Sequence, residues 1–441
     1  MTRHAQLAVS LLFGAALALA AAGAGAQGAT LADAHGVPPA LPTRTALRDP
    51  VVHLLQRVAR SEITLAGSDL EILQSVLREL TIPIASQVVV FSRTSLQGGL
   101  IRPANPRAIY FSESAYVGWV PGGLIEVAAI DPEAGPVFYG FDPQDARDAR
   151  RTLVRETSCL RCHASPAGRD VPELFARSLM TDVNGEPLAE REAFDVTDET
   201  PFDRRWGGWY VTGYRGEPSH QGNAFAAERD GQIHFQPSAE RPLELPGAFD
   251  TSRYPAPTSD VLALLIFEHQ MAMQNSLTRA AHRGRRILAA QRRPTASTQE
   301  SSAGEWDGIV EDVLDHLLFR QAAPLPAGIQ GHAAFRDAFA AGARRSGRGD
   351  ALKDLSLRGR LFANRCSFLI YSDAFGALPL PLKDRILGRL HAVLHEDDPH
   401  GRYAYLEADE KRRILEILNE THPDARRHFQ GLPTADSGPR P

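Results

Sequence analysis

The chain has 441 residues, of which 43% are hydrophobic and 23% are charged, and its formal net charge at pH 7 is −5. This length suffices for two or three domains, or for one elaborated domain. A balance this close to neutral offers no basic face, so nucleic acid is not expected as a partner. Only three cysteines are present, which excludes a fold built on several disulfides.

The first 26 residues are typical of a secretory signal peptide. Arg3 supplies the positive start, residues 7–22 are apolar, and residues 24–26 (Ala-Gly-Ala) fit the small-residue cleavage rule. A transmembrane anchor is the alternative, but the apolar stretch is short for a span of roughly 20 residues. We therefore expect residues 1–26 to be removed, leaving a mature chain without a membrane span in a bacterial periplasm.

Residues 27–86 are predicted to form an N-terminal arm followed by two helices. The arm is rich in Ala, Pro and Gly, and the first helix is expected over residues 51–60. The second helix should begin after Ser68, which can form a capping box with Glu71, and should end near Leu80.

Residues 87–145 are predicted to form a small β-region, because short β-branched and aromatic runs alternate there with turn residues. A charged stretch over residues 142–156 has a helical pattern and leads directly into a cysteine motif. Residues 146–250 carry that motif and otherwise consist of loops and short strands.

Residues 251–430 are expected to be mainly α-helical. A long helix should begin at a Ser259 N-cap, a polar break should cover residues 294–305, and shorter helices should follow, including one over residues 361–371. Residues 431–441 are expected to be disordered. The predicted fold class is α+β: a small β-region, then a loop and helix segment with the cysteine motif, then a mainly α-helical portion.

The stretch CLRCH at residues 159–163 is the attachment signature of a c-type haem. The thiols of Cys159 and Cys162 add to the haem vinyl groups, and His163 binds the iron as its proximal ligand. A redox dithiol would not need the histidine, and a zinc site would need a second Cys or His pair that the chain lacks. Cys366 is isolated and is expected to be a buried thiol. One motif predicts one covalently bound haem c.

The second axial position of the iron has several candidates. His220, in a loop rich in Gly, Pro and Asn, is the first choice, and His269, on the predicted long helix, is the second. The methionines Met180, Met271 and Met273 are further options, because methionine is a known ligand of c-type haem. Where it binds, it raises the reduction potential. An open position would instead admit small ligands.

Aromatic and basic side chains follow the motif along the chain. Trp206, Trp209 and Tyr210 could pack on the porphyrin edge, or they could form ordinary strand core. Arg204 and Arg205 could pair with the haem propionates, although solvated arginines are the simpler interpretation.

Several stretches together resemble a group of exported bacterial proteins described as cytochrome c domain-containing proteins. The stretches are VVVFSRTSLQ, PRAIYFSESAYVGWVPGG, RETSCLRCHASP, RWGGWYVTG with SHQGN, and NRCSFLIYSDAFGALP. The resemblance covers residues 85–395 and implies haem c at Cys159, Cys162 and His163, together with a periplasmic location. His220 matches in position within its loop. The motif lies mid-chain after a β-region, unlike that of a small class I cytochrome c, so that helical fold and its methionine ligand are not implied.

Two functions from different classes are consistent with these residues. The favoured one is a periplasmic monohaem c-type cytochrome that transfers single electrons between redox partner proteins. The alternative is a haem enzyme or small-ligand sensor, whose open site would take peroxide, a nitrogen oxide or an organic substrate, with His220 as a general acid or base. The first predicts a six-coordinate low-spin iron that binds no carbon monoxide. The second predicts a five-coordinate ferrous iron that binds it.

Overall fold

The largest sheet of the structure has seven strands in the order β6-β5-β4-β3-β2-β1-β9, and every neighbouring pair is antiparallel. Strands β1 to β6 follow one another along the chain, whereas β9 joins the edge beside β1 from a later segment. The strands are β1 (Val88–Val90), β2 (Arg107–Phe111), β3 (Ala115–Trp119), β4 (Ile125–Asp131), β5 (Gly135–Phe141), β6 (Val154–Arg155) and β9 (Trp209–Tyr210). Two short hairpins pair β7 (Arg177–Ser178) with β8 (Phe194–Asp195), and β10 (Ala226–Arg229) with β11 (Gln232–Phe235).

The computed structural model describes residues 46–143, 152–164, 171–188, 193–245, 247, 249–292, 296–395, 398 and 400–431, with the backbone alone for residues 296–303. The predicted signal peptide and nearly all of the predicted tail lie outside these ranges. The helices are α1 (Pro50–Ala59), α2 (Asp69–Glu79), α3 (Leu160–His163), α4 (Val261–Gln291), α5 (Ala296–Leu317), α6 (Ala333–Ala341), α7 (Asp373–Gly376), α8 (Leu380–Leu394), α9 (Ala408–Thr421) and α10 (Pro423–Gln430). The combination of helices with an antiparallel sheet confirms the α+β class in general terms.

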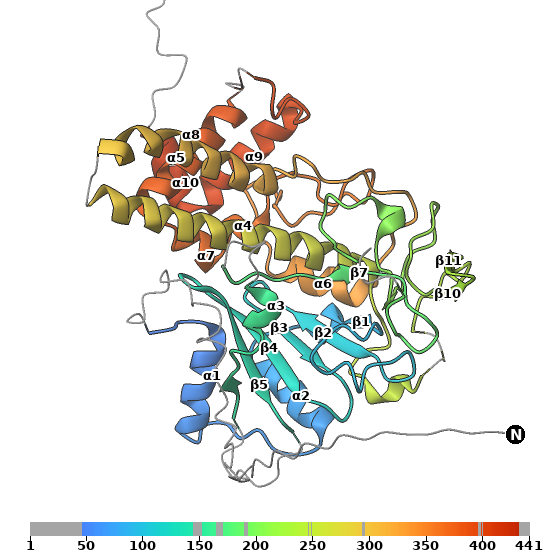
Figure 1. The fold of residues 1–441 in the computed structure, drawn as a ribbon. Helices are drawn as coiled ribbons and strands as arrows, with labels where there is room; N and C mark the ends of the chain where they lie inside the picture. The colour runs from blue at the N-terminus through green and yellow to red at the C-terminus, as the bar shows by residue number, and fades with distance from the viewer. Residues whose placement is uncertain are drawn as a thin grey trace, which may run out of the picture. The chain divides into compact units, whose positions relative to one another are not determined.

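Side chains alternate between the two faces of the large sheet, as the two-residue period of strands requires. On one face, Tyr110 and Val117 belong to a core that includes residues of α1 and α2. On the other face, Tyr116 and Phe138 belong to a core that includes much of α4, and Cys159 packs against this second core. Figure 1 shows α1 and α2 on one side of the sheet and α4 on the other. The cysteine motif therefore lies on the α4 side.

The predicted capping box of α2 is confirmed, because Ser68 and Glu71 each bond the other's backbone N–H. The predicted cap of α4 is wrong by one residue. Asp260 is the N-cap, and its Oδ1 accepts a hydrogen bond from the Leu262 N–H at 2.7 Å. The Ser259 hydroxyl instead donates to the Tyr210 carbonyl at 2.6 Å. Because the Ser259 hydroxyl bonds to Tyr210, it does not cap the helix.

The helix expected over residues 361–371 is also absent from that described stretch, where only Phe368–Tyr371 form a short 3-10 helix. The backbone N–H of Ser367 donates to the Leu317 carbonyl at 2.7 Å, so it is not available for a helical bond within the segment. The apolar periodicity predicted a helix with hydrogen bonds inside the segment. This N–H bonds to a residue of another segment instead.

Two further boundaries differ from prediction. The polar break expected at residues 294–305 is largely helical, because α5 already begins at Ala296. The end of the charged stretch over residues 142–156 is a strand, since Val154–Arg155 pair with β5. None of the helices within the described ranges is both long and apolar enough to cross a membrane.

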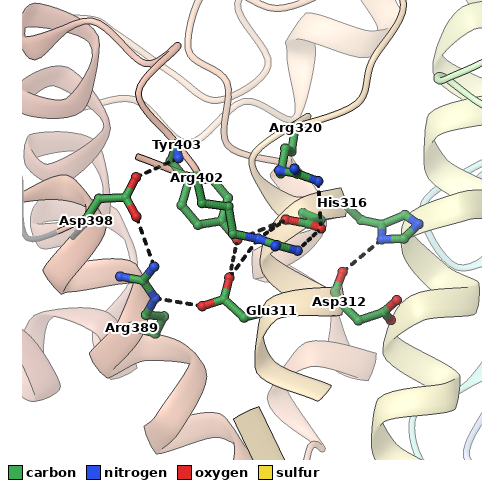
Figure 2. A network of polar contacts seen from close by, with 9 residues as sticks. Glu311, Asp312, His316, Arg320, Arg389, Asp398, Arg402 and Tyr403 are labelled. Atoms are coloured by element: carbon green, nitrogen blue, oxygen red, sulfur yellow. Dashed lines mark hydrogen bonds and ion pairs between the residues drawn. The ribbon is translucent and has the colours of Figure 1, made fainter. Parts of the chain in front are cut away.

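An ion-pair network fastens the helical region together (Figure 2). Arg389 of α8 donates to Glu311 of α5 at 2.8 Å and to Asp398 at 3.1 Å. Tyr403 donates its hydroxyl to Glu311 at 2.8 Å, and Arg402 lies 3.1 Å from the same carboxylate. These bonds join α5, α8 and the loop at residues 398–403, and thereby support the helix layer that packs on α4.

Candidate functional site

Strand β6 delivers the cysteine motif to the large sheet. After β6 pairs with β5, the Glu156 N–H donates to the Phe138 carbonyl at 2.9 Å, and the Glu156 carboxylate accepts from the Ser158 N–H at 2.8 Å. The chain then turns into α3, where the N–H groups of Cys162 and His163 both donate to the Cys159 carbonyl, at 3.1 and 3.0 Å. Both thiols and the imidazole are therefore carried on one short helical turn.

His163 is held in the form that a metal ligand requires. Its Nδ1 lies 2.7 Å from the Glu173 carbonyl oxygen, to which it can donate only as N–H. Its ring lies 4.6 Å from the ring of Phe138 and 4.4 Å from that of Phe175, measured between centroids. Burial lowers the pKa of His163, with the Glu173 bond acting in the opposite direction, so the ring is neutral at pH 7. A neutral imidazole protonated at Nδ1 presents the Nε2 lone pair to a metal.

Cys159, Cys162 and His163 line one cavity of about 290 Å³ on the α4 side of the sheet. This volume lies just below the usual range of small-molecule sites, roughly 300–1,000 Å³. The cavity walls are mainly apolar and come from the sheet, from the segment after the motif and from α4: Ile109, Tyr116, Phe138, Leu174, Phe175, Trp209, Phe267 and Met271.

An ion pair lies in the same cavity lining. Arg107 of β2 reaches across β3 to Glu126 of β4, with Nη2 and Oε2 2.6 Å apart. Gly118 makes this crossing possible, because a Cβ there would lie 2.1 Å from Arg107 Nη2. The Nε of Arg107 is buried and has no hydrogen-bond partner in the described part of the chain. The guanidinium can therefore pair with a further anionic group in the cavity.

One face of α4 holds the segment that supports His163. Asn275 accepts from the Leu174 N–H at 2.8 Å and donates to the Leu174 carbonyl at 2.7 Å. Arg279, one turn further on, donates to the Glu173 carboxylate at 2.6 Å. Phe267 and Met271, the preceding residues at the same four-residue spacing, line the cavity. The four positions form one stripe that faces the motif.

The thiols lack the features of the two rival sites. Burial, with added repulsion from Glu126 and Glu156, raises the pKa of Cys159 to about 11, whereas an active dithiol needs a lowered thiol pKa. In the regions that the structure describes, no group of three or more His, Cys, Asp or Glu side chains is placed to hold a metal ion. Cys366 is fully buried in the helical core. Neither the raised pKa of Cys159 nor the described residues around the motif point to an active dithiol or a zinc site.

His220, the first-choice distal ligand, does not share this cavity with the motif. It is 4% exposed and lies among the rings of Phe202, Trp206 and Tyr214, at centroid distances of 6.1, 5.2 and 5.5 Å. Its Nδ1 accepts a hydrogen bond from the Gly222 N–H at 3.0 Å, and burial lowers the pKa of the ring to about 3. The neutral ring thus carries its proton on Nε2, the nitrogen that would otherwise be available to iron.

His269, the second choice, also lies outside the cavity lining. Its Nδ1 lies 2.9 Å from the Asp198 carboxylate and its Nε2 lies 2.8 Å from the Ser367 hydroxyl, so both nitrogens have partners. Its ring stacks on Phe319 at 4.1 Å. His269 and Ser367 are fully buried and do not line the cavity beside the motif, and this Asp-His-Ser row connects α4 to its neighbours.

The aromatic and basic candidates fall into two groups, those that line the cavity and those that bond elsewhere. Trp209 lines the cavity, whereas Trp206 donates its ring N–H to Glu268. Arg205, expected to be solvated or to meet a propionate, is 1% exposed and donates to Glu268 at 2.7 Å. Arg204 lies over the Phe194 ring at 4.6 Å. The arginines that do line the cavity, Arg107 and Arg177, were not singled out from the sequence.

No protein-family model, curated protein or solved structure matches this chain. The resemblance to exported cytochrome c domain-containing proteins therefore stays a prediction. Sequence reasoning missed Glu173, Asn275 and Arg107, which act through hydrogen bonds and ion pairs to residues far away along the chain. For Asn275 the four-residue spacing with Met271 was a usable signal.

Proposed function

We propose that this protein is a periplasmic monohaem c-type cytochrome that transfers single electrons between protein partners. The proposal rests on one observation: Cys159, Cys162 and His163 line a single cavity, and the Nδ1 of His163 is committed to a backbone carbonyl. Haem c, when bound, supplies an iron that carries one electron by cycling between Fe(III) and Fe(II).

The residues of the chain have distinct tasks in this proposal. Cys159 and Cys162 would hold the haem covalently, each by adding its S–H across one vinyl C=C to give a thioether, which needs no oxidant. His163 offers its Nε2 lone pair. Arg107 supplies a cation for a propionate, and its unpartnered Nε fits this role. The apolar walls keep water away from the site, which raises the cost of charge there and so tunes the reduction potential.

A haem enzyme or small-ligand sensor remains the alternative function. The observation that favours it is the Arg107–Glu126 pair in the cavity lining, since such a pair can bind an anion or exchange a proton with a substrate. In this alternative the second axial position is open to peroxide, a nitrogen oxide or an organic molecule.

Covalent haem is the primary test. The full chain is produced in a bacterial periplasm with a haem c maturation system, and haem is stained after denaturing electrophoresis. The wild type should retain one haem per chain, and the double variant Cys159→Ala/Cys162→Ala should retain none. Cys366→Ala, which removes the third and fully buried cysteine, is the matched control and should keep its haem. A wild type without covalent haem, or a double variant with it, would overturn the proposal.

Electron transfer is tested on the same preparation. Potentiometric titration should fit a single one-electron step, and the reduced protein should pass its electron to a soluble oxidised cytochrome without consuming any other substrate. Mass spectrometry of the exported chain should give a start at Gln27, which checks the predicted cleavage. A reduced protein that consumes peroxide or a nitrogen oxide catalytically would instead support the haem enzyme.

A further inference from the structure

The helix α4 presents a potential iron ligand to the motif. The stripe of Phe267, Met271, Asn275 and Arg279 repeats every four residues, so its members lie on one helix face about 6 Å apart. Arg279 bonds to Glu173, whose carbonyl supports His163, and Asn275 bonds to Leu174, the next residue. Met271 precedes Asn275 by one turn and lines the cavity together with Cys159, Cys162 and His163.

We infer that Met271 is the second axial ligand of the haem iron, an inference that rests on the proposed function. Met271 is 4% exposed and belongs to the second core, so its thioether is held in an apolar wall. A thioether is an uncharged ligand that such surroundings favour, and the pair of histidine and methionine is an established c-type ligand set.

The other potential ligands in the cavity lining are committed elsewhere. Tyr116 donates its hydroxyl to Gln274 at 2.5 Å and accepts from Gln270 at 2.8 Å, and burial raises its pKa, which disfavours the phenolate. Glu126 is paired with Arg107. The thiols of the motif are used in the thioether bonds. Tyr139 donates its hydroxyl to Asp49 at 2.7 Å. Among the described lining residues, Met271 is then the remaining side chain with a soft donor atom for iron.

The inference selects between the two classes of function. A methionine on the second axial position closes the iron to exogenous ligands and raises its reduction potential relative to a bis-histidine haem. The protein would then be a six-coordinate electron carrier that donates to acceptors of high potential, and Arg107 would hold a propionate instead of a substrate.

Optical and magnetic spectra of the holoprotein test the ligand directly. Wild-type ferric protein should be low-spin and show the weak red charge-transfer band of a methionine–Fe(III) bond, and the ferrous form should take up no carbon monoxide. Met271→Leu conserves volume and should lose the band, become high-spin or water-ligated, and bind carbon monoxide in the ferrous state. Met271→His should restore a low-spin iron at a lower potential.

Matched variants separate ligation from packing. Met273→Leu lies two residues away on α4, is fully buried and does not line the cavity, so its spectra should equal those of the wild type. His220→Ala should also leave the band in place. Unchanged spectra in Met271→Leu, or loss of the band in His220→Ala, would overturn the inference while covalent haem and the proposed electron transfer stand. A five-coordinate wild type would overturn both the inference and the electron carrier, and absent haem would overturn the proposed function itself.

Discussion

Asn275→Ala tests whether α4 holds the segment that supports His163. The side chain makes two hydrogen bonds to Leu174, one to its N–H at 2.8 Å and one to its carbonyl at 2.7 Å. Alanine removes both, and each contributes about 0.5–1.5 kcal/mol net. The free energy of locally opening this segment should therefore fall by about 2 kcal/mol.

Amide hydrogen exchange measures that opening where it occurs. Because every 1.4 kcal/mol is a factor of ten, a loss of about 2 kcal/mol predicts about 30-fold faster exchange of the Glu173 N–H, whose bond to the His163 carbonyl at 2.7 Å survives the substitution. The Leu264 N–H, which donates to the Asp260 carbonyl at 2.9 Å near the start of α4, serves as the internal reference and should change little.

Arg279→Ala provides the matched control on the same helix face. Its ion pair with Glu173 is about a quarter exposed on both sides, and such pairs contribute about 0–1 kcal/mol. Exchange of the Glu173 N–H should then accelerate less than about fivefold. The reasoning fails if Asn275→Ala changes this amide by less than about twofold, or if Arg279→Ala has the larger effect.

Two further predictions concern the helical region. The pKa of Asp398 lies below its ordinary value because the Tyr403 N–H and the Arg389 guanidinium outweigh burial, which would raise it. The contribution of Asp398 to the free energy of unfolding is therefore complete above about pH 4 and is lost as the pH falls through the lowered pKa. Asp398→Asn should lower the free energy of unfolding by about 1.5–3 kcal/mol at pH 7. In urea unfolding the deficit should disappear in acid, and a deficit independent of pH would contradict this account. His269→Ala leaves Asp198 and Ser367 without their shared partner and should destabilise by about 2–4 kcal/mol while the haem spectrum stays unchanged; a changed spectrum would place His269 near the iron.

The sequence was informative where the determinants are local. The cysteine motif needs five consecutive residues, and its helical turn follows from bonds within residues 158–164. The capping box of Ser68 and Glu71 is equally local, and the structure confirms it. The start of α4 was missed by one residue because two capping residues, Ser259 and Asp260, are adjacent, and only the fold assigns the first of them to Tyr210.

Local composition did not place His220 in the cavity that the cysteine motif lines. His220 was chosen for its Gly- and Asn-containing loop, yet that loop closes on Phe202, Trp206 and Tyr214. Which histidine faces a cavity depends on contacts between residues far apart in the chain, and a single sequence carries no direct record of them. The four-residue spacing of the α4 stripe can be recognised in the sequence. Its partners, Leu174 and Glu173, are about 100 residues away along the chain.

For the proposed electron carrier, the large size of the chain has a structural reason in α4. A helix that offers Met271 to one side must be covered on its others, and α4 is buried along most of its length. Ser276 meets Asp312 of α5 at 3.1 Å, and His269 meets Ser367 at 2.8 Å, so the helical region fixes α4 against the sheet. A ligand on a rigid helix keeps its position better than one on a loop. On the proposed assignment, the iron should therefore keep both ligands in its two oxidation states, which is the condition for repeated electron transfer without exchange of ligands.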